Sequence, residues 1–160
     1  MRKYLKWTAI VLALLFIGIQ FVRPSRTNPP IDETQTIQAK LNVPPEIDSI
    51  LARSCNDCHS NRTDWIWYSN VAPASWFMAS HVEEGRIELN FSEWGKLSPG
   101  RASRKLEEIC EQVNAGEMPI WNYVLLHPSA HLTDADKKAL CDWAKREQEK
   151  IDAVLRKAQN

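Results

Sequence analysis

The stretch SCNDCHSNRTDWIWYSN, Ser54–Asn70, places two cysteines and a histidine within five residues. Cys55, Cys58 and His59 form the pattern C-x-x-C-H, which is the attachment sequence of c-type haem. Two thiols three positions apart on one helical turn can each add to a haem vinyl group, and the adjacent imidazole is then held beneath the iron. The pattern therefore predicts haem c bound covalently through Cys55 and Cys58, with His59 as an iron ligand.

Three other interpretations of the same residues are weaker. A structural zinc site needs two further ligands, but Cys110 and Cys141 lie 52 and 83 residues beyond Cys58, at no recognised zinc spacing. A thioredoxin-like redox pair requires a βαβ setting, and no strand pattern precedes Cys55. A chance occurrence in an exported protein is the third alternative.

A run of bulky aromatic residues follows the motif. Haem is a large apolar disc that must be shielded from water, and indole N–H groups can reach its propionates. We expect this run to contribute to that shielding, although each residue is equally compatible with an ordinary core position. The residues are Trp65, Trp67, Tyr68, Trp76 and Phe77.

A sixth iron ligand has few candidates, and a methionine opposite histidine suits electron transfer. Met118 is favoured because it lies in NAGEMPIWNY, 59 residues after His59, where Gly116 and Pro119 interrupt a helix. His81, on a helix expected from about residue 73 to 84, is the alternative and would give bis-histidine ligation. The remaining candidates are expected in the core (Met78) or in a solvated loop (His127, His131), and an open sixth position is also possible.

The N-terminus differs from the rest of the 160-residue chain. Residues 4–22, YLKWTAIVLALLFIGIQFV, carry a single charge, at Lys6, and end without the small residues of a signal-peptidase site. We expect an uncleaved transmembrane helix, with the N-terminus in the cytoplasm because basic residues are concentrated before it. From residue 27 onward 15 basic residues face 20 acidic ones, and this acidic body argues against nucleic acid as a partner.

Helical periodicity dominates the remaining sequence. A proline pair opens a helix over EIDSILARSC, and Leu106, Ile109 and Val113 share one face of another. Thr133 and Asp136 resemble a capping box before a final helix that buries Leu140, Trp143 and Ala144. We predict an all-α fold, a small cytochrome c-like helical domain behind the N-terminal helix. Its expected parts are residues 1–22 (anchor or signal), 23–43 (proline-rich linker), 44–146 (haem domain) and 147–160 (charged, exposed helix extension).

The order of these motifs resembles cytochrome c and, more narrowly, the haem-binding domain family (Haem_bd) of small membrane-anchored bacterial proteins. CNDCHSNRTDWIWYSNVAPASWFMASHVEEGRIELNFSEW and GEMPIWNYVLLHPSAHLTDADKKALCDWA carry the resemblance, over residues 44–146. It implies covalent haem on Cys55 and Cys58, His59 as iron ligand and, by analogy with cytochromes c, Met118 opposite. The segment between His59 and Met118 departs from that pattern, because it holds an extra helix with His81.

These observations predict a monohaem single-electron carrier in the periplasm, bound to the cytoplasmic membrane and serving redox protein partners. A haem enzyme or gas sensor with an open sixth position is the alternative, and an interaction module that carries haem only for stability is a third. Cys110 and Cys141 remain outside the haem motif. An oxidising compartment permits a bridge between them, but we favour two separately buried thiols, since free cysteine is among the most buried residue types.

Overall fold

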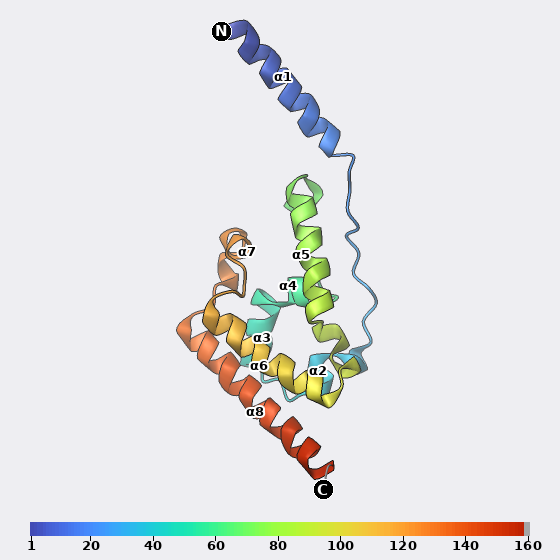
Figure 1. Ribbon diagram of the computed structural model, residues 1–160, viewed down its shortest axis with the longest axis vertical. Helices are drawn as coiled ribbons and strands as arrows, with labels where there is room; N and C mark the ends of the chain where they lie inside the picture. The colour runs from blue at the N-terminus through green and yellow to red at the C-terminus, as the bar shows by residue number, and fades with distance from the viewer. Residues whose placement is uncertain (159–160) are drawn as a thin grey trace.

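Helices make up all the regular secondary structure in residues 1–158, the part of the chain that the computed structural model describes (Figure 1). This confirms the predicted all-α fold class. The α-helices are α1 (Arg2–Ile19), α2 (Ile37–Lys40), α3 (Pro45–Ser54), α4 (Asn56–His59), α5 (Ala74–Glu88), α6 (Pro99–Ala115), α7 (Trp121–Leu126) and α8 (Asp134–Ala158). The 3-10 helices are η1 (Glu33–Gln35), η2 (Trp67–Asn70), η3 (Phe91–Lys96) and η4 (Pro128–Ala130).

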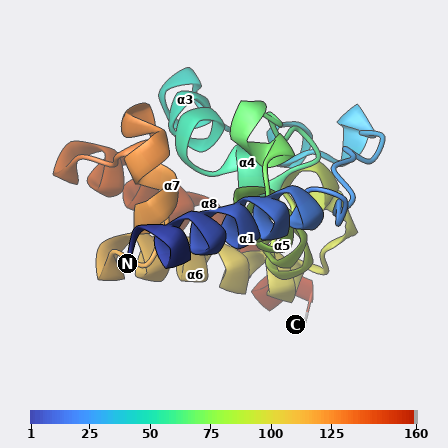
Figure 2. The same ribbon diagram turned by 90° about the horizontal axis from the view of Figure 1, so that it is seen from above.

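The core lies where α3, α6 and α8 meet, and α6 and α8 run side by side (Figures 1 and 2). The faces predicted from helical periodicity are the ones that the structure buries. Leu106 of α6 and Leu140 of α8 are fully buried, and Trp143 donates its indole N–H to the Asn42 carbonyl at 2.9 Å. Helix α3 begins at Pro45, as expected for a residue whose missing N–H costs nothing in the first turn.

Segments on either side of residues 44–146 also contribute to this core. Ile37, in the stretch expected to be a linker, is fully buried. It begins the short helix α2, which Thr36 caps and which packs against η3. Beyond residue 146, Ile151 packs against the core and Asp152 accepts a hydrogen bond from Ser103 at 2.7 Å. Residues 147–158 are therefore partly covered by α6, where the sequence suggested an exposed extension.

A disulfide joins Cys110 of α6 to Cys141 of α8, with the two Cα atoms 5.0 Å apart. The prediction of two separately buried thiols was wrong. The physical reason is the close packing of α6 on α8, which brings the two cysteines together from positions 31 residues apart. The bridge, which was the other of the two alternatives, is the one that the structure contains.

Helix α1 extends away from the helical body and buries none of its side chains (Figure 1). Arg2, Lys3 and Lys6 occupy its first two turns. Among residues 1–158, no helix combines the length and the apolar character needed to cross a membrane, so the predicted transmembrane anchor is not supported.

The start of α8 is a capping box that also reaches α3. Thr133 accepts a hydrogen bond from the Asp136 N–H at 3.1 Å, and the Asp136 carboxylate accepts one from the Thr133 N–H at 2.9 Å. Arg53 adds an ion pair to Asp136 at 2.7 Å. The hydrogen bonds from the Thr133 backbone and hydroxyl, followed by Arg53, hold the pKa of Asp136 below its usual value.

Removal of the disulfide should destabilise the fold. The bridge closes a loop of 31 residues, so Cys110→Ala with Cys141→Ala should lower the free energy of unfolding by about 3 to 4 kcal/mol. Urea unfolding of the variant and the parent chain measures this difference. Two reactive thiols in the denatured, unreduced chain, counted in addition to any at Cys55 and Cys58, would contradict the bridge.

Acid should weaken the α8 cap. A carboxylate with a depressed folded-state pKa stabilises the fold above its unfolded pKa of about 3.9, and the contribution is lost as pH falls through the folded value. Asp136→Asn should therefore be less stable than the parent chain at neutral pH and equally stable in strong acid. Thr133→Ala, which removes the cap hydroxyl, should cost about 1 kcal/mol at neutral pH. An Asp136→Asn deficit that persists unchanged in acid would contradict this assignment.

Candidate functional site

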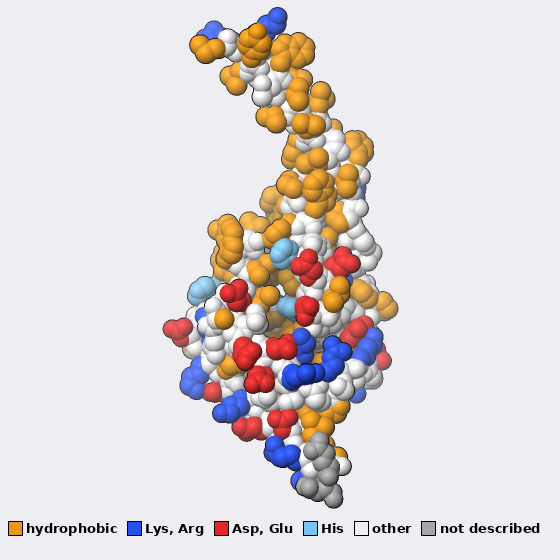
Figure 3. All heavy atoms as spheres, in the orientation of Figure 1, with side chains coloured by type: hydrophobic (Ala, Val, Ile, Leu, Met, Phe, Trp, Pro, Cys, Tyr) orange, Lys and Arg blue, Asp and Glu red, His pale blue; other side chains and the backbone are white. Residues whose placement is uncertain are grey.

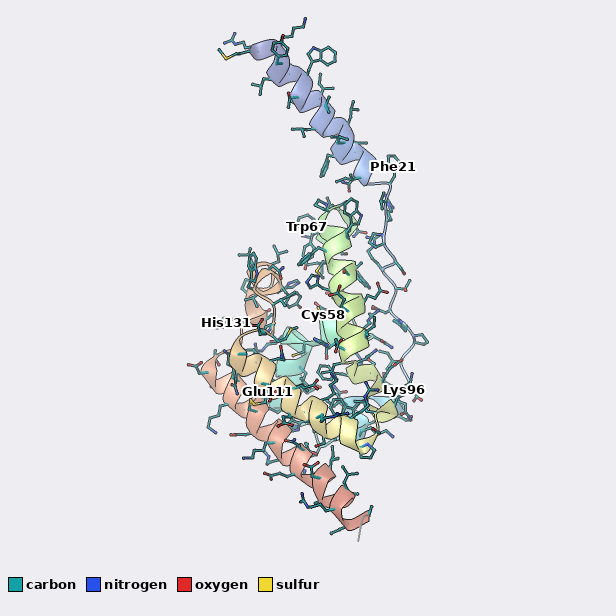
Figure 4. All side chains as sticks on the ribbon, in the orientation of Figure 1. Phe21, Cys58, Trp67, Lys96, Glu111 and His131 are labelled. Carbon is teal, nitrogen blue, oxygen red and sulfur yellow. A yellow bond between two sulfur atoms is a disulfide. The ribbon has the colours of Figure 1, made fainter. Side chains whose placement is uncertain are left out.

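The C-x-x-C-H residues form one tight turn directly after α3. Cys55 leaves the helical backbone conformation, and its carbonyl then accepts the N–H groups of Cys58 at 3.2 Å and His59 at 2.9 Å. The two sulfurs are thereby presented from one turn, and neither belongs to a disulfide. Figure 4 shows Cys58 in the space between α5 and α7.

A glycine allows α5 to lie directly against this turn. A Cβ atom on Gly85 would stand 2.6 Å from the Cys58 carbonyl oxygen and 3.1 Å from the Cys58 Cβ. No real Cβ approaches backbone so closely. Glycine is therefore required at this position by the contact between α4 and α5.

That contact fixes the orientation of the His59 ring. Its Nδ1 lies 2.9 Å from the Gly85 carbonyl and 3.1 Å from the Leu89 carbonyl. Carbonyls only accept hydrogen bonds, so Nδ1 carries the proton and Nε2 is left with a free lone pair. Burial keeps the pKa of His59 below its ordinary value and so favours the neutral ring. This is the arrangement that a metal-ligating histidine requires.

Two cavities meet at His59. The larger has a volume of about 340 Å³, within the roughly 300–1,000 Å³ of typical ligand pockets, and the smaller has about 190 Å³. Both are lined by Cys55, His59, Glu88, Met118 and Pro119. The wall of the larger one is mostly apolar, with Lys105, Glu108 and Gln112 also on it, and its apolar residues are Leu89, Phe91, Ile109, Val113, Leu132 and Leu140. Figure 3 shows a hollow on this face of the molecule with a histidine side chain inside it.

The two candidates for the sixth ligand are both near these cavities. Met118 lines both of them together with His59, whereas His81 lines only the smaller. The His81 Nδ1 lies 2.8 Å from the Phe77 carbonyl, which leaves its Nε2 free as well. Met78 is buried and His131 is exposed, and neither lines the two cavities within the described residues.

The two motif thiols are held in the protonated state. Burial raises the pKa of Cys55 to about 12, and the neighbouring Cys58 adds to the effect. Burial and the adjacent Asp57 carboxylate raise the pKa of Cys58 to about 11. Both side chains are therefore neutral S–H groups at physiological pH.

Arg86, which sequence reasoning missed, organises the loop after the motif. Its guanidinium donates to the Ser60 carbonyl, the Thr63 hydroxyl and the Asn28 side chain, each at 2.8 Å. Ser60 in turn closes α4 by donating to the Asn56 carbonyl at 2.7 Å. These partners lie 23 to 58 residues from Arg86, so no local sequence pattern could have indicated the role.

A polar network supports the motif from the side of α7. The Tyr123 hydroxyl donates to the Asp57 carboxylate at 2.7 Å, and the Tyr123 ring stacks on His127 at 4.0 Å. The His127 Nδ1 contacts the Tyr123 carbonyl, so its Nε2 accepts the hydrogen bond from the Tyr68 hydroxyl at 3.1 Å. His127 was expected to be a solvated loop residue, but both of its ring nitrogens form hydrogen bonds within this network.

The aromatic run lies elsewhere than expected. Among the described residues that line the two cavities, none is one of the five aromatic residues predicted to shield the haem. Tyr68 and Phe77 line a neighbouring cavity, and Trp67 is 75% exposed. Hydrophobic residues from η3, α6 and α8, together with Leu89 just after α5 and Leu132 just before α8, supply the wall of the larger cavity instead.

These features together define a haem-binding class of site: two adjacent thiols, an imidazole with its free nitrogen at an apolar cavity, and a thioether at the same cavity. The family comparison agrees. A haem-binding domain model matches residues 14–146, and the chain belongs to this haem-binding domain family. No curated protein and no solved structure matches the chain.

Gly85→Ala should disturb the site because the new methyl group would overlap the Cys58 carbonyl. We expect the free energy of unfolding to fall by about 1 to 3 kcal/mol, the usual range for an overpacked contact. Gly100→Ala is the matched control, since that glycine is also helical and has no atom within 4 Å of an added Cβ. It should be neutral or stabilising. Equal effects of the two substitutions in urea unfolding would contradict the close approach of α5 to α4.

Proposed function

We propose that the protein carries haem c, linked through Cys55 and Cys58, and passes single electrons between redox proteins. The observation that carries this proposal is the His59 ring, fixed through Nδ1 with Nε2 free at a cavity that Cys55 and Met118 also line. The haem iron supplies the redox chemistry by cycling between its ferrous and ferric states. Every other task falls to the protein.

The thiols supply the covalent link. Each S–H group would add across one vinyl double bond of the haem, so that a C–S bond would form at one vinyl carbon and the thiol hydrogen would go to the other. The addition consumes no external oxidant, and it requires reduced cysteines. Cys55 and Cys58 meet that requirement because both are unbridged and protonated.

Lys105 is suited to the carboxylate groups of the haem. It lines the larger cavity, its side chain is largely buried, and it pairs with Glu108 at 2.6 Å and Glu88 at 3.8 Å. A propionate that displaced one of these carboxylates would retain the charge pairing. The apolar wall around Leu89 and Ile109 would cover the porphyrin ring and exclude water.

Met118 is the sixth ligand that the site favours. It lines both cavities with His59, so the two side chains border the same space from α4 and from the segment before α7. Thioether ligation opposite histidine raises the reduction potential and closes the iron to external ligands. Both effects suit an electron carrier.

We place the haem domain at the outer face of the cytoplasmic membrane, in the periplasm. The Cys110–Cys141 disulfide and the thioether motif both fit an oxidising compartment. The exposed apolar residues of α1, with Arg2 and Lys3 at its start, fit attachment to an anionic lipid surface.

A haem enzyme or gas sensor is the second candidate, and the smaller cavity between Met118 and His81 is the observation that favours it. An open sixth position there would accept a small ligand such as peroxide or carbon monoxide. Addition of carbon monoxide to the reduced protein at neutral pH separates the two functions. Prompt spectral change would identify the open site, and an unchanged spectrum is expected for the electron carrier.

Covalent attachment should depend on both cysteines. Cys55→Ser or Cys58→Ser should leave haem linked through one thioether, and the double substitution should leave all haem extractable into acidified acetone. Cys110→Ser is the control for loss of a cysteine outside the motif, and it should keep haem on the chain. Haem stain on a denaturing gel of the double variant would rule out the assignment.

Methionine ligation should give the oxidised protein a weak far-red absorption band. Met118→Ala should abolish this band, whereas His81→Ala should preserve it. Loss of the band in Met78→Ala alone would move the ligand to Met78. A parent protein without the band, but with near-infrared features typical of bis-histidine iron, would assign the ligand to His81.

A further inference from the structure

An exposed apolar cluster covers one end of the haem domain. We name it the apolar end, and it consists of Trp67, Val71, Phe77, Trp121, Leu125 and Leu126. The cluster is continuous, because Phe77, Trp121, Leu125 and Leu126 surround one apolar cavity of about 200 Å³ that Tyr68 also lines. Trp67 packs edge-on against Tyr68 with ring centres 5.8 Å apart. In Figure 3 apolar side chains dominate this end of the body.

Helix α1 joins the body at the same end. The Gln20 side chain donates to the Ala72 carbonyl at 3.2 Å and accepts the Ala72 N–H at 2.9 Å. The Trp76 indole N–H donates to the Val22 carbonyl at 2.7 Å, and Arg26 donates to the Ser69 carbonyl at 2.8 Å. Figure 4 shows Phe21 at the end of α1 and Trp67 near the end of α5 that lies closest to α1. The exit of α1 is therefore fixed beside the apolar end.

Because α1 joins the body at this end, the exposed apolar surface of α1 is continuous with the apolar end. Trp7, Leu12 and Phe16 of α1 are at least half exposed, and Phe21 and Val22 extend the exposed apolar surface to the junction. The acidic residues Glu83 and Glu84 follow Phe77 by about two turns along α5, further from the junction. An apolar environment that covers α1 as far as Phe21 and Val22 therefore also reaches the junction at Ala72 and Trp76, beside the apolar end.

We propose that the apolar end docks on the lipid surface to which α1 is attached, with Trp67 and Trp121 at the membrane–water interface. This inference rests on the membrane attachment proposed above. Tryptophan favours that interface because its ring is apolar while its N–H stays hydrated. Exposed apolar clusters of this kind mark interaction surfaces in soluble domains. Docking fixes how the haem domain is presented, with the C-terminal end of α8 directed away from the lipid (Figure 1).

Hydroxyl-radical footprinting of the full chain on vesicles of phosphatidylcholine and phosphatidylglycerol tests the proposal. The oxidation rate of each side chain is divided by its intrinsic reactivity. Trp67 and Trp121 are 75% and 77% exposed, and the control residues Ile87 and Val154 are 74% and 65% exposed. Docking should slow oxidation of the two tryptophans by about tenfold relative to the two controls, whereas similar normalised rates would overturn the docking.

Two further measurements distinguish failure of the membrane attachment from failure of the docking. Protection of Leu12 and Leu14 in α1 from oxidation reports the membrane attachment itself. If these two residues are not protected, the attachment is overturned. If they are protected while Trp67 and Trp121 stay reactive, only the docking is overturned. Protection of the tryptophans that disappears on dilution to one chain per vesicle would identify a second copy as the covering surface and overturn lipid docking.

A charge placed in the cluster provides the matched variant. Leu125→Asp puts a carboxylate on α7 at the proposed lipid contact, where its dehydration is costly, and should restore the oxidation of Trp67 and Trp121. Val154→Asp makes the same change at an exposed position of α8 and should leave both rates unchanged. Tryptophans that stay protected in Leu125→Asp would contradict docking through this surface.

Discussion

The close approach of α5 to the C-x-x-C-H turn is the constraint on which the rest of the site depends. Because Gly85 has no side chain, the last turn of α5 brings two carbonyls within hydrogen-bond distance of the His59 Nδ1. The same approach allows Arg86 to hold the loop after the motif. One missing methyl group thus determines both the tautomer of the histidine and the path of the chain beyond it.

Local features of the sequence were sufficient to predict much of the fold. The helix beginning at Pro45, the Thr133–Asp136 capping box and the buried faces of α6 and α8 each depend on residues within a turn or two of one another. The motif thiols and His59 are local in the same sense. The hydrogen-bonded ring of His59 was not predictable, because its acceptors lie 26 and 30 residues away.

Proximity in sequence does not imply proximity in space where the chain turns sharply. The aromatic residues after His59 were expected at the haem, but Trp67, at the start of η2, is exposed and lines neither of the two cavities at His59. The cavity wall comes instead from Leu89, Ile109 and Leu132, which belong to three separate segments. Their meeting depends on how the helices cross, and helix crossing is a property of the assembled core.

The disulfide also depends on how α6 packs across α8. Ile109 precedes Cys110 and Leu140 precedes Cys141, and both apolar residues line the larger cavity. The bridge therefore joins the two helices next to residues that line the larger cavity, which His59 of α4 and Glu88 of α5 also line. A wall that is cross-linked by the chain itself keeps its spacing before any large apolar group is attached. Because the disulfide is part of the chain, it holds α6 and α8 together beside Ile109 and Leu140 whether or not the cavity is filled.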